Sequence, residues 1–234
     1  MGCGMVLILT SDGGTGSSVA KGLEKLNIST VCRDEKSDIG DISQYDAAFF
    51  TGDFAIGSID CVELVKKICK ECSSAEIPVV FDPTLSVLQP ECYATINELA
   101  AVCEIFVPSD EDAKSLCALS DPEKIAEHYL NLGTKKIIVT LDKKGAYFKS
   151  SKESGYVPTF RADKVINTNG AGNAFAAGLI SGVIDDIPLA EAAVRANACG
   201  CIYIQHEGEY FPDASELREY MLSHRFAVEG CKEF

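Results

Sequence analysis

The 234-residue sequence contains no tryptophan and only three histidines. His128, His206 and His224 lie far apart along the chain, which does not favour a histidine metal centre. Basic residues are also few, because 21 lysines and arginines stand against 35 aspartates and glutamates, for a formal net charge of −14. Nucleic acids and anionic membranes need clustered cations on the protein, so we expect neither as a partner.

Long hydrophobic runs are missing as well. Met5–Leu9 is too short for the core of a secretory signal, and no segment approaches the length of a membrane span. The eleven cysteines are an odd number, which does not favour a disulfide framework. We expect reduced thiols in a cytoplasmic protein, most of them packed in the core. For the lone C-x-x-C pair of Cys69 and Cys72, helix packing is a better explanation than zinc binding.

The order of apolar segments predicts the fold class. Strand-like runs alternate with helix-like segments, which is typical of a mostly parallel central sheet with helices on both faces. No linker or internal repeat interrupts this order, so we predict a single α/β domain over residues 1–234. The predicted strands are 5–10, 28–32, 45–51, 78–82, 105–108, 136–141, 145–148 and 156–160, the last two forming an antiparallel pair around a turn at 150–154. The predicted helices lie near 19–26, 59–72, 90–101, 122–133, 171–183, 189–203 and 215–222.

The most informative stretch is Asn167–Gly178, where small residues lead directly into a predicted helix. The main-chain amides of Gly170, Ala171 and Gly172 are expected to be free and to point at one spot, where the helix dipole adds positive potential. Such a turn binds an anion or stabilises a negative charge that forms during a reaction. The residues alone equally allow an ordinary glycine-rich helix start, in which Gly178 permits close packing.

This stretch resembles the D-T-x-G-A-G-D signature of the ribokinase-like (PfkB) carbohydrate kinases. Four other segments resemble family motifs in the family's order: Val80–Pro83 (D-P-N), Phe106–Ala113 (P-N-x-x-E-A), Ile138–Ala146 (V-T-L-G-x-x-G-A) and Ala196–Ala198 (N-A). Residues 202–208 are also similar to fructoselysine kinase-like members. The resemblance implies a three-layer ribokinase-like sandwich and ATP-dependent phosphoryl transfer to a sugar hydroxyl.

The resemblance also implies roles for individual residues, with Mg-ATP as cofactor and a sugar or sugar-amine as substrate. Gly170, Ala171 and Gly172 match the amides that hold the migrating phosphoryl group. The positions that match the nucleotide site are Thr140, Asp142, Lys143, Gly145 and Asn197. Asp112 matches the acidic residue of the metal-linked N-x-x-E motif. Gly13, Gly14 and Ser18 match either a sugar-binding element or, equally well, the start of a D-D-x-G helix.

Four ligand-facing positions depart from the family pattern. Asn173 stands where the family has its general base, and a carboxamide cannot accept a proton at neutral pH; a positioned base contributes ~10²–10⁴-fold to the rate. Asn167 replaces the first aspartate of the signature, which puts the family's monovalent-cation site in doubt. Asp142 replaces a glycine that faces the nucleotide phosphates, where a carboxylate repels them. Ser109 replaces the asparagine of N-x-x-E.

The segment between the first predicted helix and the third predicted strand is short. Too few residues lie between Leu26 and Tyr45 for the strands of the lid that closes over the sugar in this family, so we expect the lid sheet to be absent or reduced. Lid closure normally excludes water and positions the acceptor. We therefore expect impaired catalysis.

Three hypotheses remain open on the sequence. The first is a sugar kinase of minimal architecture, in which Asp163 or Asp82 replaces the missing base. The second is a catalytically degenerate protein that binds a nucleotide or sugar and acts in regulation. The third is a Rossmann-type dinucleotide binder, because residues 14–19 after the first strand, with Asp34 ending the next one, imitate its fingerprint without the third glycine.

Overall fold

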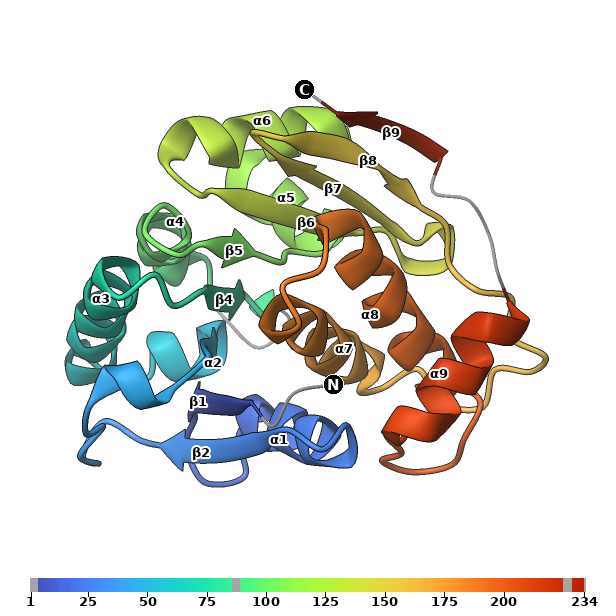
Figure 1. The fold of residues 1–234 in the computed structure, drawn as a ribbon. Helices are drawn as coiled ribbons and strands as arrows, with labels where there is room; N and C mark the ends of the chain where they lie inside the picture. The colour runs from blue at the N-terminus through green and yellow to red at the C-terminus, as the bar shows by residue number, and fades with distance from the viewer. Residues whose placement is uncertain (1–3, 86–88, 225–228, 234) are drawn as a thin grey trace.

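The computed structural model describes residues 4–85, 89–224 and 229–233, with side chains as far as residue 224. Its described strands form one nine-stranded sheet in the order β2-β1-β3-β4-β5-β6-β7-β8-β9 (Figure 1). Strands β1 to β6 are parallel, and the last three pairings are antiparallel. The strands are β1 (Met5–Leu9), β2 (Ser29–Arg33), β3 (Ala47–Thr51), β4 (Val79–Asp82), β5 (Ile105–Phe106), β6 (Lys136–Thr140), β7 (Ala146–Ser150), β8 (Glu153–Val157) and β9 (Glu229–Glu233).

The parallel strands are buried on both faces. All residues of β3 are buried, as are the last four of β1, which explains why these strands are continuous apolar runs rather than alternating ones. Strand β1 pairs with both β2 and β3, so the first strand of the chain lies inside the sheet. The mostly parallel sheet predicted from the sequence is confirmed.

The predicted antiparallel pair is present, but the predicted turn at 150–154 is wrong. Strands β7 and β8 leave only Ser151 and Lys152 between them. The hydroxyl oxygen of Ser150 accepts hydrogen bonds from the amides of Lys152 and Glu153, both 3.1 Å, which tightens the turn. Strand β8 ends at Val157, before the predicted 160, because Pro158 has no N–H to donate. Its other edge pairs with β9, which the sequence did not predict.

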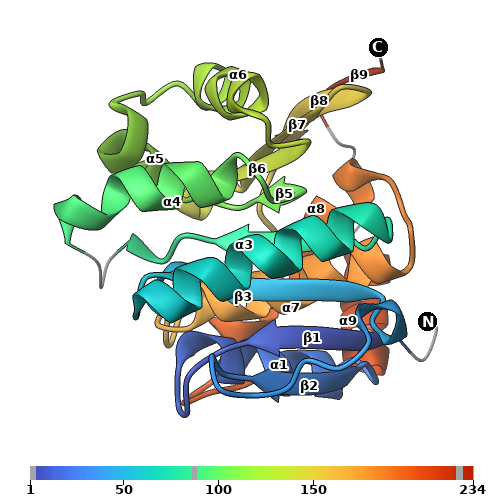
Figure 2. The same cartoon turned by 90° about the vertical axis from the view of Figure 1, so that its left-hand side faces the viewer.

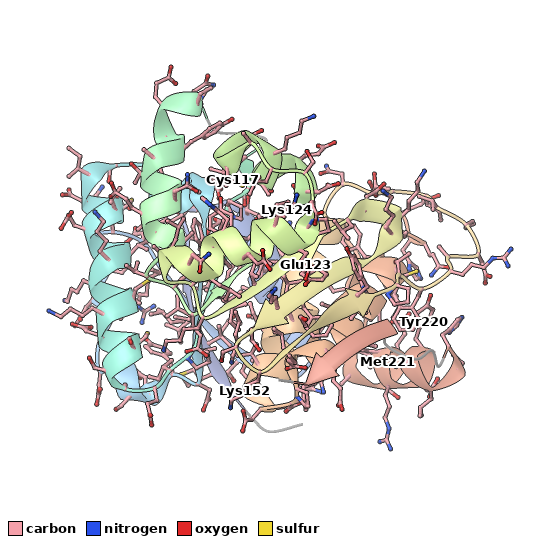
Figure 3. The ribbon with its side chains drawn as sticks, turned by 90° about the horizontal axis from the view of Figure 1, so that it is seen from above. Cys117, Glu123, Lys124, Lys152, Tyr220 and Met221 are labelled. Atoms are coloured by element: carbon pink, nitrogen blue, oxygen red, sulfur yellow. The ribbon has the colours of Figure 1, made fainter. Side chains whose placement is uncertain are left out.

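Helices cover both faces of the sheet (Figure 2). One layer contains α1, α7, α8 and α9, and the other contains α3, α4, α5 and α6. Seen from above, Glu123 marks α6 and Tyr220 marks α9, on either side of strands β7 and β8 (Figure 3). The helices are α1 (Thr15–Lys25), α2 (Gly52–Ala55), α3 (Ile59–Ser74), α4 (Tyr93–Ala100), α5 (Asp110–Cys117), α6 (Pro122–Leu132), α7 (Ala171–Ile184), α8 (Leu189–Tyr203) and α9 (Ala214–Ser223).

Helix boundaries follow their capping residues. Asp121 accepts hydrogen bonds from the amides of Glu123 and Lys124 and so begins α6, and Gly133 is its C-cap, close to the predicted bounds of 122–133. The sequence did not predict helix α5, because its apolar stripe is short. A capping box begins it, in which Ser109 and Asp112 bond each other's main-chain amides. Within the described ranges, no helix combines the length and apolar character needed to span a bilayer.

Helices α7 and α8 pack closely at the centre of one layer. A side chain at Gly178 would place its Cβ 2.9 Å from the Cα of Ala196, so this contact requires glycine. The close packing that the sequence allowed for Gly178 is therefore present. It does not exclude a binding role for the start of α7, seven residues earlier in the chain.

The nine cysteines whose side chains are described are free thiols, and six of them are buried. Cys69 and Cys72 lie on the buried face of α3, where burial raises the pKa of each thiol to about 12. Among the described residues, no group of three or more His, Cys, Asp or Glu side chains could hold a metal ion. The C-x-x-C pair is thus part of the core packing.

The described segment between α1 and β3 contains no strands of a separate lid. From α1 the chain passes through β2 and a 3₁₀ turn at Ile42–Gln44 directly into β3. Within the described residues every named strand belongs to the single sheet. The fold is thus a three-layer α/β sandwich without a second sheet in the part of the chain that the structure describes.

Candidate functional site

A cavity of about 590 Å³ opens between the loop after β6, the segment before α7, and the walls of α7 and α8. The predicted site residues that line it are Thr140, Asp142, Lys143, Gly145, Asn197, Ala171 and Gly172. The fold therefore brings the five positions of the predicted nucleotide site to one hollow, together with two residues of the predicted anion-binding turn. Gly170 and Asn173 are not among the lining residues.

The loop after β6 forms the charged side of the cavity. The amide of Leu141 donates to the carbonyl of Gly145 at 2.8 Å, and the amide of Gly145 donates to the carbonyl of Asp142 at 3.0 Å. This tight loop holds Asp142 at a φ of +52°, which is unusual for an aspartate, and exposes both Asp142 and Lys143. Lys143 is the cation and Asp142 the carboxylate among the lining residues.

The turn before α7 is held in an open conformation. Gly170 has a φ of +100°, and the amide of Asn169 donates to the side-chain oxygen of Asn167 at 3.0 Å. The amides of Gly170 and Gly172 have no hydrogen-bond acceptor among the described residues, and Gly172 is exposed. The expectation of three free amides is wrong for Ala171, whose amide closes the turn on the carbonyl of Thr168 at 3.2 Å. Two donors and the positive end of a 14-residue helix remain available to an anion.

Asn173 lies in the first turn of α7. Its amide donates to the carbonyl of Gly170 at 3.0 Å, while its half-buried side chain forms no hydrogen bond with the described residues. Asn167, the other altered position of the signature, donates from Nδ2 to the carbonyl of Gly208 at 3.2 Å. A carboxamide can make this direct bond, whereas an aspartate would need a cation between the two oxygens.

Helix α8 supplies the opposite wall. Asn197 is buried, and its Nδ2 donates to the carbonyls of Val157 and Pro158 at 3.3 and 3.4 Å. These bonds fix α8 to the end of β8 and leave the side-chain oxygen of Asn197 as an acceptor. Gly200 and Cys201 continue the wall one turn later. The result is a largely apolar slot with a few fixed polar groups, which is typical of small-molecule sites.

A second polar group at the carboxyl end of the sheet was not predicted. Thr51 Oγ1 and Asp53 Oδ1 are buried without a hydrogen-bond partner in the described part of the chain. The hydroxyl of Thr15 donates to Asp53 Oδ2 at 3.2 Å, which connects the start of α1 to the start of α2. The signal in the sequence was the polar triplet 51–53 directly after a wholly buried strand, where ligand sites of parallel sheets lie.

Asp82 belongs to the same edge, because it pairs with Thr51 across strands β3 and β4. Burial, together with the nearby carboxylates of Asp112 and Asp53, raises the pKa of Asp82 to about 7, against hydrogen bonds from Thr84 that lower it. Its Oδ1 accepts from the amide and hydroxyl of Thr84 at 3.0 and 3.1 Å. Asp82 is therefore a partly protonated carboxyl near neutral pH, as a substitute base would be.

Of the remaining predicted site residues, those at the front of the chain lie outside the cavity. Gly14 is the N-cap of α1, and Gly13 precedes it with a φ of +71°. Ser18 donates to Glu209 at 2.6 Å, on the side of α1 that faces residues 205–210. Asp34 accepts hydrogen bonds from Lys36 and Ser37 in a local turn.

Two further carboxylates have defined places. Asp112 Oδ2 accepts a hydrogen bond from the amide of Ser109 as part of the α5 cap. One of the two carboxylate oxygens of this predicted metal ligand is therefore already engaged. Asp163 is exposed, and its amide donates to the side chain of Gln205. Asp112 does not line the cavity, so a magnesium ion there would be held chiefly by nucleotide phosphates, which is how Mg²⁺ usually binds in phosphoryl-transfer sites.

A larger hollow of about 850 Å³ lies at the opposite end of the sheet, beside the first residues of β4 and before β5 and β6. Two of its lysines, Lys66 and Lys135, form ion pairs with Glu98 and Glu104. None of the motif residues reaches it. The candidate site is therefore the smaller cavity at the carboxyl end.

Comparison with known proteins identifies the family of this chain. The pfkB family carbohydrate kinase model matches residues 10–216. The chain is 34% identical over 145 residues to 2-dehydro-3-deoxygluconokinase of Bacillus subtilis (strain 168), covering 61% of this chain and 45% of that protein. It is 33% identical over 150 residues to aminoimidazole riboside kinase of Salmonella typhimurium, covering 59% and 44%. The chain spans about half the length of the curated relatives it matches.

Solved structures share the fold. Fructokinase with bound ATP from Xylella fastidiosa superposes with a TM-score of 0.79 at 13% identity, covering 94% of this chain and 98% of the other. A putative ribokinase II from E. coli in complex with ATP and Mg²⁺ gives a TM-score of 0.77 at 17% identity, covering 94% and 99%. The similarity to fructoselysine kinase-like members stays a prediction. The family model covers most of this chain, and the described residues form a ribokinase-like sandwich, so this chain belongs to the pfkB family of carbohydrate kinases.

Proposed function

We propose that this chain binds Mg-ATP in the cavity between the β6 loop, α7 and α8, and that it transfers the γ-phosphoryl group to a sugar hydroxyl slowly. The observation that carries the proposal is the open turn at Gly170–Gly172, which borders the same cavity as the predicted nucleotide residues. The B. subtilis and S. typhimurium relatives are named as kinases of a sugar acid and of a riboside. A sugar-like acceptor is therefore the substrate class to test.

Residues on different sides of the cavity would contact different parts of the nucleotide. The amides of Gly170 and Gly172 and the dipole of α7 would stabilise charge on the phosphoryl group during transfer. Lys143 adds a positive charge at the cavity mouth, and the side-chain oxygen of Asn197 accepts a hydrogen bond from the base. Magnesium, when bound with ATP, neutralises charge on the phosphates. Positioning and electrostatics are thus in place.

Proton removal from the acceptor is the weak step. Asn173 cannot take a proton, so the rate loses roughly the 10²–10⁴-fold that a positioned base supplies. Asp82 is the substitute that the structure favours over Asp163, because Asp163 is exposed whereas Asp82 lies at the sheet edge with a pKa of about 7. Slow transfer is the expected outcome.

The second candidate is a regulatory protein that binds the nucleotide or sugar without turnover. Asn173, Asn167 and Asp142 are all altered at ligand-facing positions, and the described residues contain no lid strands. Without a lid, water competes with the sugar for the phosphoryl group. The dinucleotide-binding alternative has no comparable support, since Gly16 packs against Thr10 and Ile8 rather than lining a cavity.

Two assays together distinguish the slow kinase from the regulatory protein. ATP and ADP should raise the melting temperature, since a ligand stabilises the folded state by RT ln(1 + [L]/Kd). Phosphorylated product is then measured with ATP over a panel of ketoses, pentoses, fructosamines, ribosides and sugar acids. Slow product formation supports the kinase, stabilisation without product supports the regulatory protein, and no stabilisation by millimolar nucleotide or by any acceptor of the panel contradicts both. Efficient turnover with any acceptor would contradict the impaired catalysis.

A further inference from the structure

We propose that Tyr203, with Asn167 as a second tie, positions the phosphate-binding turn before α7, so that it sets affinity for the phosphate part of a nucleotide but not for the nucleoside part. This inference rests on the proposed nucleotide binding. Tyr203 lies outside the cavity lining and outside the five segments that resemble the kinase motifs, so its effect would be exerted through the turn alone.

The contact is direct. The hydroxyl of Tyr203 donates to the carbonyl of Asn169 at 2.9 Å, one residue before the left-handed Gly170. A side chain at position 170 would collide with the same hydroxyl, so the tyrosine and the glycine fit each other. The carbonyl of Asn169 is thereby turned toward α8, and the amide of Gly170, on the other side of that peptide unit, points away from it.

Tyr203 is itself fixed on the side away from the turn. It is buried, and its ring packs against Phe211 with centroids 5.5 Å apart at 60°. Phe211 in turn packs against α1, where a Cβ at Gly22 would lie 2.8 Å from its ring. A rigid chain of contacts thus runs from α1 through Phe211 and Tyr203 to Asn169.

The second tie holds the other end of the turn. Asn167 donates from Nδ2 to the carbonyl of Gly208, and its oxygen accepts from the amide of Asn169. The amides of Ile166 and Asn167 both donate to the carbonyl of Ile204, at 2.7 and 3.2 Å. The last residue of α8 and the segment that follows it therefore hold the turn at both ends, 34 to 41 residues away in sequence.

The test compares two probes by calorimetry on the full chain: AMP-PNP, which carries phosphates, and adenosine, which does not. In Tyr203→Phe the ring packing is kept and the hydroxyl is lost, so the Kd of AMP-PNP should rise about tenfold while that of adenosine changes less than twofold. Asn167→Ala should give the same split. Tyr129→Phe is the matched control, because it removes a buried tyrosine hydroxyl bond of 2.8 Å to Asn97 in the other helix layer and should change neither Kd.

The outcomes separate the two proposals. If Tyr203→Phe and Asn167→Ala leave both affinities unchanged, or weaken both probes equally, the positioning role is overturned while nucleotide binding stands. If one variant does not fold, the other variant decides, by the change in the Kd of AMP-PNP relative to the change in the Kd of adenosine. If wild-type protein binds neither probe, the proposed function fails and the positioning role fails with it.

Discussion

The hydroxyl of Tyr203 bonds the carbonyl of Asn169 at 2.9 Å, so the last residue of α8 holds the turn that begins α7. Two helices that pack along their lengths are in this way also joined at the edge of the cavity. The bond explains how the turn stays open although only a few of its own main-chain groups are paired. It also makes the conformation of Gly170 dependent on a residue outside the five segments that resemble the kinase motifs.

Gly170→Ala should destabilise the protein by about 2 kcal/mol or more. An alanine at this position must adopt a positive φ, and its Cβ would lie 2.7 Å from Cζ of the Tyr203 ring. In the Tyr203→Phe background the loss should be smaller, because the hydroxyl part of the collision is gone. Urea unfolding of the four proteins of this cycle measures the coupling; equal losses in both backgrounds would show that the two residues act independently.

Asn173→Asp should raise the rate of sugar phosphorylation by about 10²-fold or more. The carboxylate restores a proton acceptor in the first turn of α7, next to the amides that we propose hold the phosphoryl group. Initial rates of product formation at saturating ATP give the measurement, with Asn173→Ala as the control that should show no increase. A variant that binds ATP normally but gains no rate would place the defect in the acceptor site instead.

Asp142→Gly should bind nucleotide about two- to fivefold more tightly. The exposed carboxylate repels phosphates, and its loss also relieves an aspartate held at a φ of +52°. The gain should shrink as salt is raised, because the repulsion is screened. Asp142→Asn separates charge from conformation: it should give most of the affinity gain, and an affinity equal to wild type would refute the electrostatic explanation.

Asp82→Asn should stabilise the protein more at pH 8 than at pH 5. The pKa of Asp82 in the folded state, about 7, is raised above that of an unfolded aspartate, so the folded state binds more protons between about pH 4 and pH 7. Stability from this group is therefore lost as pH rises through that window, and the asparagine does not lose it. Melting temperatures from pH 5 to 8 test this, with the exposed Asp12→Asn as control; a difference that does not depend on pH would contradict the raised pKa.

The sequence predicted the parts of this molecule that depend on local pattern. Buried parallel strands such as β1 and β3 are continuous apolar runs. Helix α6 begins directly after its N-cap, Asp121. Four of the five predicted nucleotide positions lie at the carboxyl end of β6 or in the loop after it, where ligand sites of parallel sheets occur, and Asn197 reaches the same cavity from the middle of α8.

What the sequence did not predict depends on contacts between distant segments. Tyr203 and Asn169 are 34 residues apart, and nothing in either local pattern indicates the bond between them. The buried pair of Thr51 and Asp53 becomes visible only when α1 and α2 are placed together. The amide of Ala171 was expected to be free because turn formation with Thr168 cannot be read from glycine content.

The central claim is that the start of α7 holds the phosphates of a bound nucleotide. Gly172 offers a direct test, because it is exposed and a Cβ there meets no atom within 4 Å, so a substitution leaves the fold intact. Calorimetric titration with Mg-ATP should show one site in wild type and in Gly172→Asn, and a loss of about 100-fold or more in Gly172→Asp, whose carboxylate occupies the same volume with a negative charge. Equal affinities in Gly172→Asp and Gly172→Asn would contradict the claim.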